Sequence, residues 1–238
     1  MTDDLIQHGT RYLSVHSTWS PQMLVLLVCA LLAGAGCGPD RTSTDEPAPT
    51  ARDNHPAATG ATVPGPGPVD GALRQELLDM QQRDQLVRAG EQVIADDGET
   101  LVMDDVDREN RLRLSQIFDE HGWPGRQLVG EDGSTAAWVI VQHADLDLTF
   151  QQRGLDLLAA AVAAGDASPG DLAYLTDRVL VALGEPQEYG TQWMLGDDGR
   201  WQPRTAIAEP DTVDDRRAEA GLAPLADYLD ELRAATGS

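Results

Sequence analysis

The residues best suited to chemistry stand at the end of the longest apolar run in the folded part of the chain. Residues 136–141 are apolar, and the amide of Gln142, the imidazole of His143 and the carboxylate of Asp145 follow directly. A histidine within hydrogen-bond reach of a carboxylate can serve as a general base. His143, oriented by Asp145 or Asp177, is therefore a candidate catalytic base. The alternatives are a histidine that only hydrogen-bonds at a helix end, and one that contacts a ligand without catalysis.

Two later segments repeat this mixture of apolar and polar groups. Asp177 and Arg178 lie in a segment that is apolar on both sides, so we expect them to be partly buried and to need partners. Side-chain amides both donate and accept hydrogen bonds, which suits a sugar, a peptide or another neutral polar ligand. We predict that nine residues converge on one partly buried ligand pocket, with loop anchoring by buried hydrogen bonds as the alternative. The nine are Gln142, His143, Asp145, Gln151, Asp177, Arg178, Gln187, Tyr189 and Gln192.

Several other chemistries have no signature in this sequence. His121 and His143 are the only histidines in the folded part, no His-Glu-x-x-His pair occurs, and both cysteines lie near the amino terminus. We therefore predict no metal site and no cofactor. No Gly-x-Ser-x-Gly elbow, phosphate loop or dinucleotide fingerprint is present. The 40 acidic residues outnumber the 17 basic ones, and the resulting net charge of −23 disfavours nucleic acid as a partner.

The amino-terminal segment predicts export. Residues 23–36 are apolar or small throughout, and the run is shorter than the ~20 residues that a membrane-spanning helix needs. The stretch 32–37, Leu-Ala-Gly-Ala-Gly-Cys, resembles the lipobox of bacterial lipoproteins, whose cysteine becomes the first residue of the mature protein and carries acyl chains. Gly34 stands where leucine is usual, and the leader has Arg11 as its only basic residue.

The lipobox resemblance implies a signal segment over residues 1–36 and a fatty-acyl anchor, palmitate included, on Cys37. The protein would then sit on the extracytoplasmic face of the cell membrane. A cleaved signal without lipid and an uncleaved anchor are the alternatives. Residues 37–70 are rich in Pro, Ala, Thr and Gly and hold seven of the 14 prolines. They cannot bury enough apolar surface to offset the entropy of ordering, so we predict a disordered linker.

Residues 71–238 predict a single, mainly α-helical domain with about six or seven helices. Apolar residues recur at helical spacing over most of it, and Asp70 can cap the first helix. Two short extended runs around a Gly-Asp-Asp-Gly turn predict a small β-hairpin near 191–205. Residues 131–134 favour a turn. The expected helices cover 72–88, 105–120, 136–143, 148–164, 168–183, 211–220 and 224–234.

Short motifs spread over residues 73–229 resemble a bacterial family of unknown function. Each motif is weak alone, but the combination is specific. The family carries no established activity, so the resemblance implies one helical domain and points to the same polar residues. The main motifs are His-Gly-Trp-Pro at 121–124, Gln-His-Ala-Asp at 142–145, Phe-Gln at 150–151, Ala-Tyr-Leu-Thr-Asp-Arg at 173–178, Gln-Glu-Tyr-Gly-Thr-Gln at 187–192 and Arg-Arg at 216–217.

Two functions from different classes fit these observations. In the first, a membrane-tethered lipoprotein uses its helical domain to bind a small polar ligand, a glycan, a peptide or a partner protein. In the second, an extracytoplasmic hydrolase uses His143 as general base with Asp145 or Asp177. The sequence leaves open whether the protein is an enzyme. The two hypotheses differ in what loss of the His143 side chain does, because it stops turnover in an enzyme and weakens affinity or stability in a binding protein.

Overall fold

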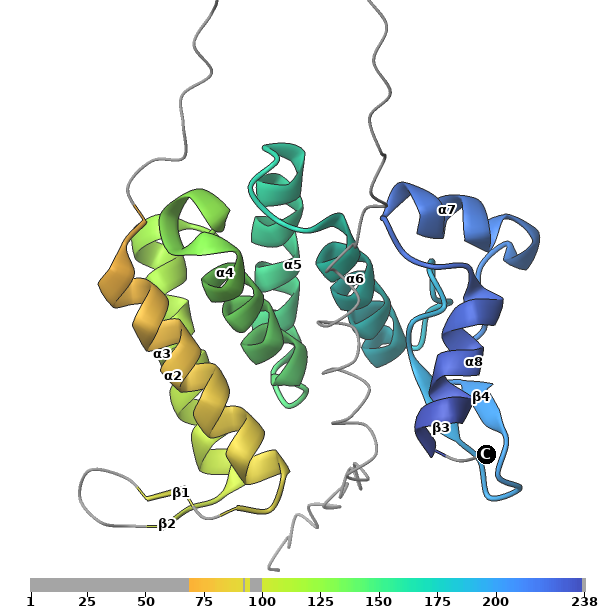
Figure 1. Ribbon diagram of the computed structural model, residues 1–238, viewed down its shortest axis with the longest axis horizontal. Helices are drawn as coiled ribbons and strands as arrows, with labels where there is room; N and C mark the ends of the chain where they lie inside the picture. The colour runs from red at the N-terminus through yellow and green to blue at the C-terminus, as the bar shows by residue number, and fades with distance from the viewer. Residues whose placement is uncertain (1–68, 92, 95–99, 237–238) are drawn as a thin grey trace, which may run out of the picture.

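The computed structural model describes residues 69–91, 93–94 and 100–236, and this part of the chain is mainly helical (Figure 1). The predicted signal segment, Cys37 and nearly all of the linker lie outside the described residues. The α-helices are α2 (Gly71–Arg88), α3 (Met103–His121), α4 (Arg126–His143), α5 (Leu148–Ala163), α6 (Pro169–Leu183), α7 (Val213–Glu219) and α8 (Leu225–Thr236). The strands are β1 (Val93–Ile94), β2 (Thr100–Leu101), β3 (Trp193–Leu195) and β4 (Trp201–Pro203), with a 3-10 turn at Pro210–Thr212. The predicted mainly α fold is confirmed.

Helices α2 to α6 form the main core. The Asp70 carboxylate caps α2 by accepting from the backbone N–H groups of Ala72 and Leu73, as the sequence predicts. Leu77, at the middle of α2, is fully buried beside Leu114 of α3 and Val139 of α4 in one apolar cluster. In Figure 1, α2 and α3 stack as one layer, with α4, α5 and α6 following in order across the domain.

Helix α4 runs through the centre of the core. It is buried on nearly every side from Ala136 to Gln142, which explains why the sequence shows a continuous apolar run there rather than a stripe. The predicted turn at 131–134 is wrong, because these residues are helical. The break falls instead at Gly130, whose φ of 77° only glycine adopts freely, and a short helical turn from Arg126 precedes it.

Helices α5 and α6 place the next polar groups. Gly154 allows α5 to approach α4 closely, because a Cβ at this position would lie 2.7 Å from the Val141 side chain. Helix α6 begins at Pro169 after the Ser168 N-cap and ends at Gly184 in a left-handed conformation, as the sequence predicts. Its buried residues include Asp177 and Arg178, which confirms that the two charges lie in the interior.

Two antiparallel hairpins complete the structure. The predicted hairpin is present as β3 paired with β4, with Met194 opposite Gln202. A second, unpredicted pair joins β1 to β2 through Val93 opposite Leu101, and each strand has only two residues. A pair this short carries too little alternation to be recognised in a sequence. No helix in the described ranges is long and apolar enough to cross a membrane.

Candidate functional site

Most of the nine predicted residues form a network of hydrogen bonds and do not line an open pocket, and His143 lies outside this network. Its centre is Asp145, just beyond the end of α4, which accepts two hydrogen bonds from Arg178 of α6, Nε to Oδ1 at 2.8 Å and Nη2 to Oδ2 at 2.7 Å. This paired geometry is the strongest arrangement available to a guanidinium and a carboxylate. Arg178 also reaches Gln192 Oε1 at 3.4 Å. The ion pair therefore joins α4, α6 and the segment before β3.

Asp177 holds the loop that follows α6. Its Oδ1 accepts from the backbone N–H groups of Glu188 and Tyr189 at 2.7 and 3.0 Å. Its Oδ2 accepts from the Thr191 N–H at 2.8 Å and from the Thr191 hydroxyl at 2.9 Å. Burial raises the pKa of Asp177, and these donors oppose the rise. A fully buried carboxylate with four donors is an anchor for the loop, not a group waiting for a substrate.

The two glutamines of this loop are bonded to each other and to the backbone. Gln187 Oε1 accepts from the Gln192 N–H at 2.7 Å, and its Nε2 donates to the carbonyls of Gln192 and Thr205. Gln192 Nε2 donates to the Thr191 hydroxyl at 3.1 Å. Tyr189 joins only through its backbone, whose carbonyl accepts from Arg217 Nη1 at 2.8 Å. The sequence motif at 187–192 thus describes a folded loop.

The remaining two amides fasten α4 to its neighbours. Gln151 Nε2, on α5, reaches the carbonyls of Val141 and Gln142 and lies 3.3 Å from Asp145 Oδ1. With its amide oxygen turned toward the available donors, Gln142 accepts from the Leu175 N–H at 2.9 Å. Both glutamines are almost completely buried. Six of the nine residues, namely Asp145, Gln151, Asp177, Arg178, Gln187 and Gln192, are therefore linked into one network through Thr191.

His143 has a different partner from those the sequence suggested. Its Nδ1 lies 2.7 Å from Asp84 Oδ2, on α2, and 3.0 Å from Arg88 Nε. One ring nitrogen cannot donate to a carboxylate and accept from a guanidinium at once. Since Arg88 Nε is also 3.0 Å from Asp84 Oδ1, we assign both hydrogens to the carboxylate, which leaves Nε2 of His143 as the acceptor. A carboxylate thus orients His143, but it belongs to Asp84 and not to Asp145 or Asp177.

The surroundings of His143 favour its neutral form. Burial lowers the pKa of His143, and only 10% of its side chain is exposed. Burial alone would raise the pKa of Asp84, but His143 and Arg88 outweigh it and bring the pKa below its usual value. Asp107, which accepts from Arg88 Nη2 at 2.5 Å, has its pKa raised by burial to about 6. The cluster is a buried charge network that ties α2, α3 and α4 together.

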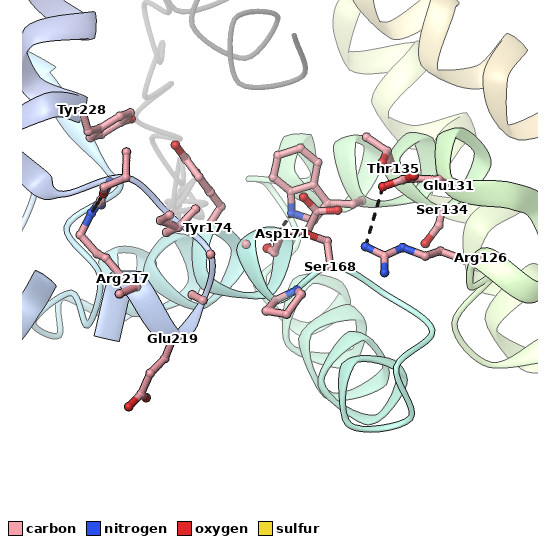
Figure 2. Close-up of a pocket in the computed structure, with 18 of the residues that line it drawn as sticks. Arg126, Glu131, Ser134, Thr135, Ser168, Asp171, Tyr174, Arg217, Glu219 and Tyr228 are labelled. Atoms are coloured by element: carbon pink, nitrogen blue, oxygen red, sulfur yellow. Dashed lines mark hydrogen bonds and ion pairs between the residues drawn. The ribbon is translucent and has the colours of Figure 1, made fainter. Parts of the chain in front are cut away.

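A cavity of about 600 Å³ lies elsewhere, between α4, α6 and the α7–α8 segment, and none of the nine predicted residues lines it (Figure 2). Three aromatic rings form part of its wall: Trp138 meets Tyr174 edge to face at 6.2 Å, and Tyr174 meets Tyr228 in the same way at 6.3 Å. Edge-to-face contact is a favourable geometry for aromatic pairs, so these three rings stabilise one another's positions. The volume falls within the range of pockets that hold small molecules.

Asp171 is the most perturbed acid in the cavity wall. It stands in the first turn of α6, beside the Ser168 hydroxyl. Burial raises the pKa of Asp171 to about 7, against the opposing effects of Arg126 and Ser168, while Glu131 adds to the rise. Arg126 and Glu131 face each other across 3.9 Å at the same side of the cavity (Figure 2). A carboxyl that is half ionised near pH 7 responds to the charge of whatever binds beside it.

Arg217 is the buried base of the cavity wall. Its side chain is 1% exposed, its Nε donates to the Ala223 carbonyl at 2.6 Å, and its guanidinium carbon lies 5.1 Å from the centre of the Tyr228 ring. Burial lowers the pKa of Arg217. The Tyr228 hydroxyl donates to the Thr191 carbonyl at 3.0 Å, so this side of the cavity is fastened to the loop that Asp177 holds.

The sequence does not single out the cavity, because its wall comes from separate segments. Tyr174 and Arg217 lie in two of the motifs, at 173–178 and 216–217, but no local pattern places them side by side. In the sequence, Trp138 is one residue of an apolar run, and Asp171 is one of 40 acidic residues. Arg217 was recognisable only as half of an Arg-Arg pair. The i, i+4 spacing of Asp84 and Arg88 on α2 was the one available signal for the partner of His143. Within the described residues, no group of three or more His, Cys, Asp or Glu side chains is arranged to hold a metal ion.

The protein is a helical domain in which the hairpin β3–β4 and the helices α7 and α8 follow the core helices, with a polar and aromatic cavity between α4, α6 and the α7–α8 segment. Residues 71–238 match a family of unknown function, DUF6624, and the chain belongs to that family. The predicted membership of an uncharacterised family is therefore confirmed. No curated protein and no solved structure matches the chain.

Proposed function

We propose that the domain binds a small polar ligand in the cavity between α4, α6 and the α7–α8 segment. The observation that carries this proposal is the coincidence, in one cavity of about 600 Å³, of three aromatic rings with acidic and basic side chains. Aromatic faces supply contact area, and a few convergent polar groups supply orientation, which is the usual make-up of a small-molecule site. The polar network around Asp145 and Asp177 supports the cavity by fixing the loop behind it.

The amino-terminal sequence supports a second part of the proposal, which is where the protein is located. The apolar run 23–36 and the Cys37 that ends it favour a lipoprotein, whose linker would hold the binding domain away from the extracytoplasmic membrane surface. A binding protein tethered in this way captures solutes or cell-wall fragments without leaving the membrane. Replacing Cys37 with Ala and separating soluble from membrane fractions tests the anchor. A variant that stays with the membrane as the parent does would contradict it.

A thermal-shift screen of the full-length protein in detergent tests the binding function. Amino acids, short peptides, sugars and nucleosides serve as probes, and a true ligand raises the unfolding temperature by mass action. Ala218→Trp places a large side chain at the cavity wall, and Ala182→Trp is the matched control on an exposed part of α6 outside the cavity. We expect a ligand to stabilise the parent and the control but not Ala218→Trp. Equal stabilisation of all three would show that the cavity is not the site.

A hydrolase remains the second candidate, and the contact between His143 and Asp84 at 2.7 Å favours it. A neutral histidine with its Nδ1 hydrogen held by a carboxylate presents Nε2 as a base, which is the arrangement that hydrolytic enzymes use. Binding is the stronger proposal because the cavity is lined by other residues. Hydrolysis of ester and amide probes by the parent but not by His143→Gln, with unfolding temperatures that agree, would reverse this order.

A further inference from the structure

Arg217 is a buried cation without a carboxylate partner among the described residues. Its Nε and Nη1 donate to the carbonyls of Ala223 and Tyr189, and no acceptor for Nη2 lies within the part of the chain that the structure describes. The charges of Asp214 and Asp177 act on Arg217, but neither acid forms an ion pair with it within the described residues. A guanidinium that is 1% exposed normally has an anion beside it. The wall of the cavity is where such an anion would fit.

The rest of the cavity is lined by two acids together with one base. Asp171 and Glu131 face it, and the nearest base, Arg126, is 3.9 Å from Glu131 and makes no closer ion pair. Figure 2 shows Arg217 and Tyr228 on one side of the pocket, Asp171 near its middle, and Arg126 with Glu131 on the far side. The cavity therefore has the buried Arg217 guanidinium at one pole, where Glu219 and Glu231 also line the wall, and Asp171 and Glu131 beside Arg126 toward the other. The rings of Tyr174 and Trp138 lie in the wall between them.

We propose that this cavity binds a zwitterionic ligand of the amino-acid or short-peptide class, with the carboxylate at Arg217 and the ammonium group at Asp171 and Glu131. The inference rests on the proposed binding function and specifies its ligand. A charged hydrogen bond at each end fixes the direction of the ligand, and the aromatic wall packs against its apolar part.

The charges argue against the simpler ligands. A sugar would leave the buried guanidinium without an anion, because a neutral hydroxyl makes a weaker hydrogen bond to a guanidinium than a carboxylate does. A plain anion would meet Glu131, Asp171 and Glu231 in the same cavity. A plain cation would share the pocket with Arg217. A ligand with both charges, separated by a few bonds or by one or two peptide units, satisfies both poles.

Calorimetric titration of the full-length protein in detergent tests this with blocked and unblocked ligands. The probes are dialanine and trialanine, each also acetylated at the amino end, amidated at the carboxyl end, or blocked at both ends, with sucrose as a neutral polar probe. We expect a free peptide to bind, each single block to weaken binding at least tenfold, and the double block and sucrose to show no binding. Ala218→Trp should abolish all of it.

Protein variants assign the two poles. In Asp171→Asn, acetylating the peptide should weaken its binding much less than it does in the parent, whereas amidating the peptide should weaken its binding as before. The control Asp215→Asn changes an exposed acid outside the cavity and should bind all peptides as the parent does. Arg217→Gln tests the other pole, and if it fails to fold, the amidated peptide on the parent protein gives the same information. Equal affinity for free and doubly blocked peptides, or binding of neutral ligands alone, would overturn the zwitterion and leave the binding function standing. If no probe of the thermal-shift screen binds at the cavity, both fail.

Discussion

Helix α6 carries two acids with different surroundings: Asp177 belongs to the polar network, and Asp171 lines the cavity. At Asp177, every oxygen of the carboxylate accepts two hydrogen bonds from the loop 188–191. At Asp171, the carboxyl has only the Ser168 hydroxyl beside it and a distant guanidinium, and its pKa is about 7. Both acids lie on α6. The comparison teaches that a buried polar group already matched by its own chain builds the fold, whereas one that is left unmatched beside a cavity is available to a ligand.

The largest expected effect lies in the network. Asp177→Ala removes the acceptor of four hydrogen bonds and leaves the backbone N–H groups of Glu188, Tyr189 and Thr191 without it. We expect the free energy of unfolding to fall by ~3–5 kcal/mol. Urea unfolding followed by circular dichroism measures it, with Asp215→Ala as the exposed control. A loss below ~1 kcal/mol would mean that the loop is held by other contacts.

The opposite sign is expected at the cavity. Because the folded pKa of Asp171 is raised from 3.8 to about 7, its ionisation disfavours the fold, so its contribution to stability is complete below pH ~4 and is lost as the pH rises through 7. Asp171→Asn removes this loss. The variant should be more stable than the parent at pH 8, by up to about 4 kcal/mol, and no more stable at pH 4.

Unfolding of both proteins in urea across this pH range checks the prediction. Asp107, whose pKa of about 6 is also raised by burial, contributes a dependence of the same sign in parent and variant alike, so the difference between the two isolates Asp171. If Asp171→Asn were less stable than the parent at pH 8, the Asp171 carboxylate would stabilise the fold, as the Asp177 carboxylate does.

The smallest expected effect sharpens the contrast. Thr135 lines the cavity from α4, and its hydroxyl makes no hydrogen bond within the described residues. Thr135→Val keeps the shape of the side chain, so we expect the unfolding free energy to change by no more than ~0.5 kcal/mol, while binding of a cavity ligand changes measurably. Thermal unfolding with and without the ligand separates the two quantities. A large loss of stability would show that this wall, too, is structural.

The sequence by itself determined the helical class and most of the helix ends. The Asp70 cap, Pro169 at the start of α6 and Gly184 at its end act through a few neighbouring atoms, so their residue types carry the information. The burial of Asp177 and Arg178 also followed from local periodicity, because a helix that is apolar on both sides has no solvent face to offer them.

The tertiary structure alone decided which polar groups meet. His143 lies beside Asp84, which is 59 residues away in the chain, and no local pattern specifies that pairing against Asp145, two residues away. Residues 131–134 are helical where the sequence predicts a turn, and in this segment Asp132 accepts from Arg74 Nε of α2 at 2.8 Å, a contact 58 residues apart in the chain. The cavity draws its wall from α4, α6, α7 and α8, and its unmatched charges exist only once these helices have packed. Local hydrogen bonds determine where helices begin and end, and long-range packing determines which polar side chains come into contact.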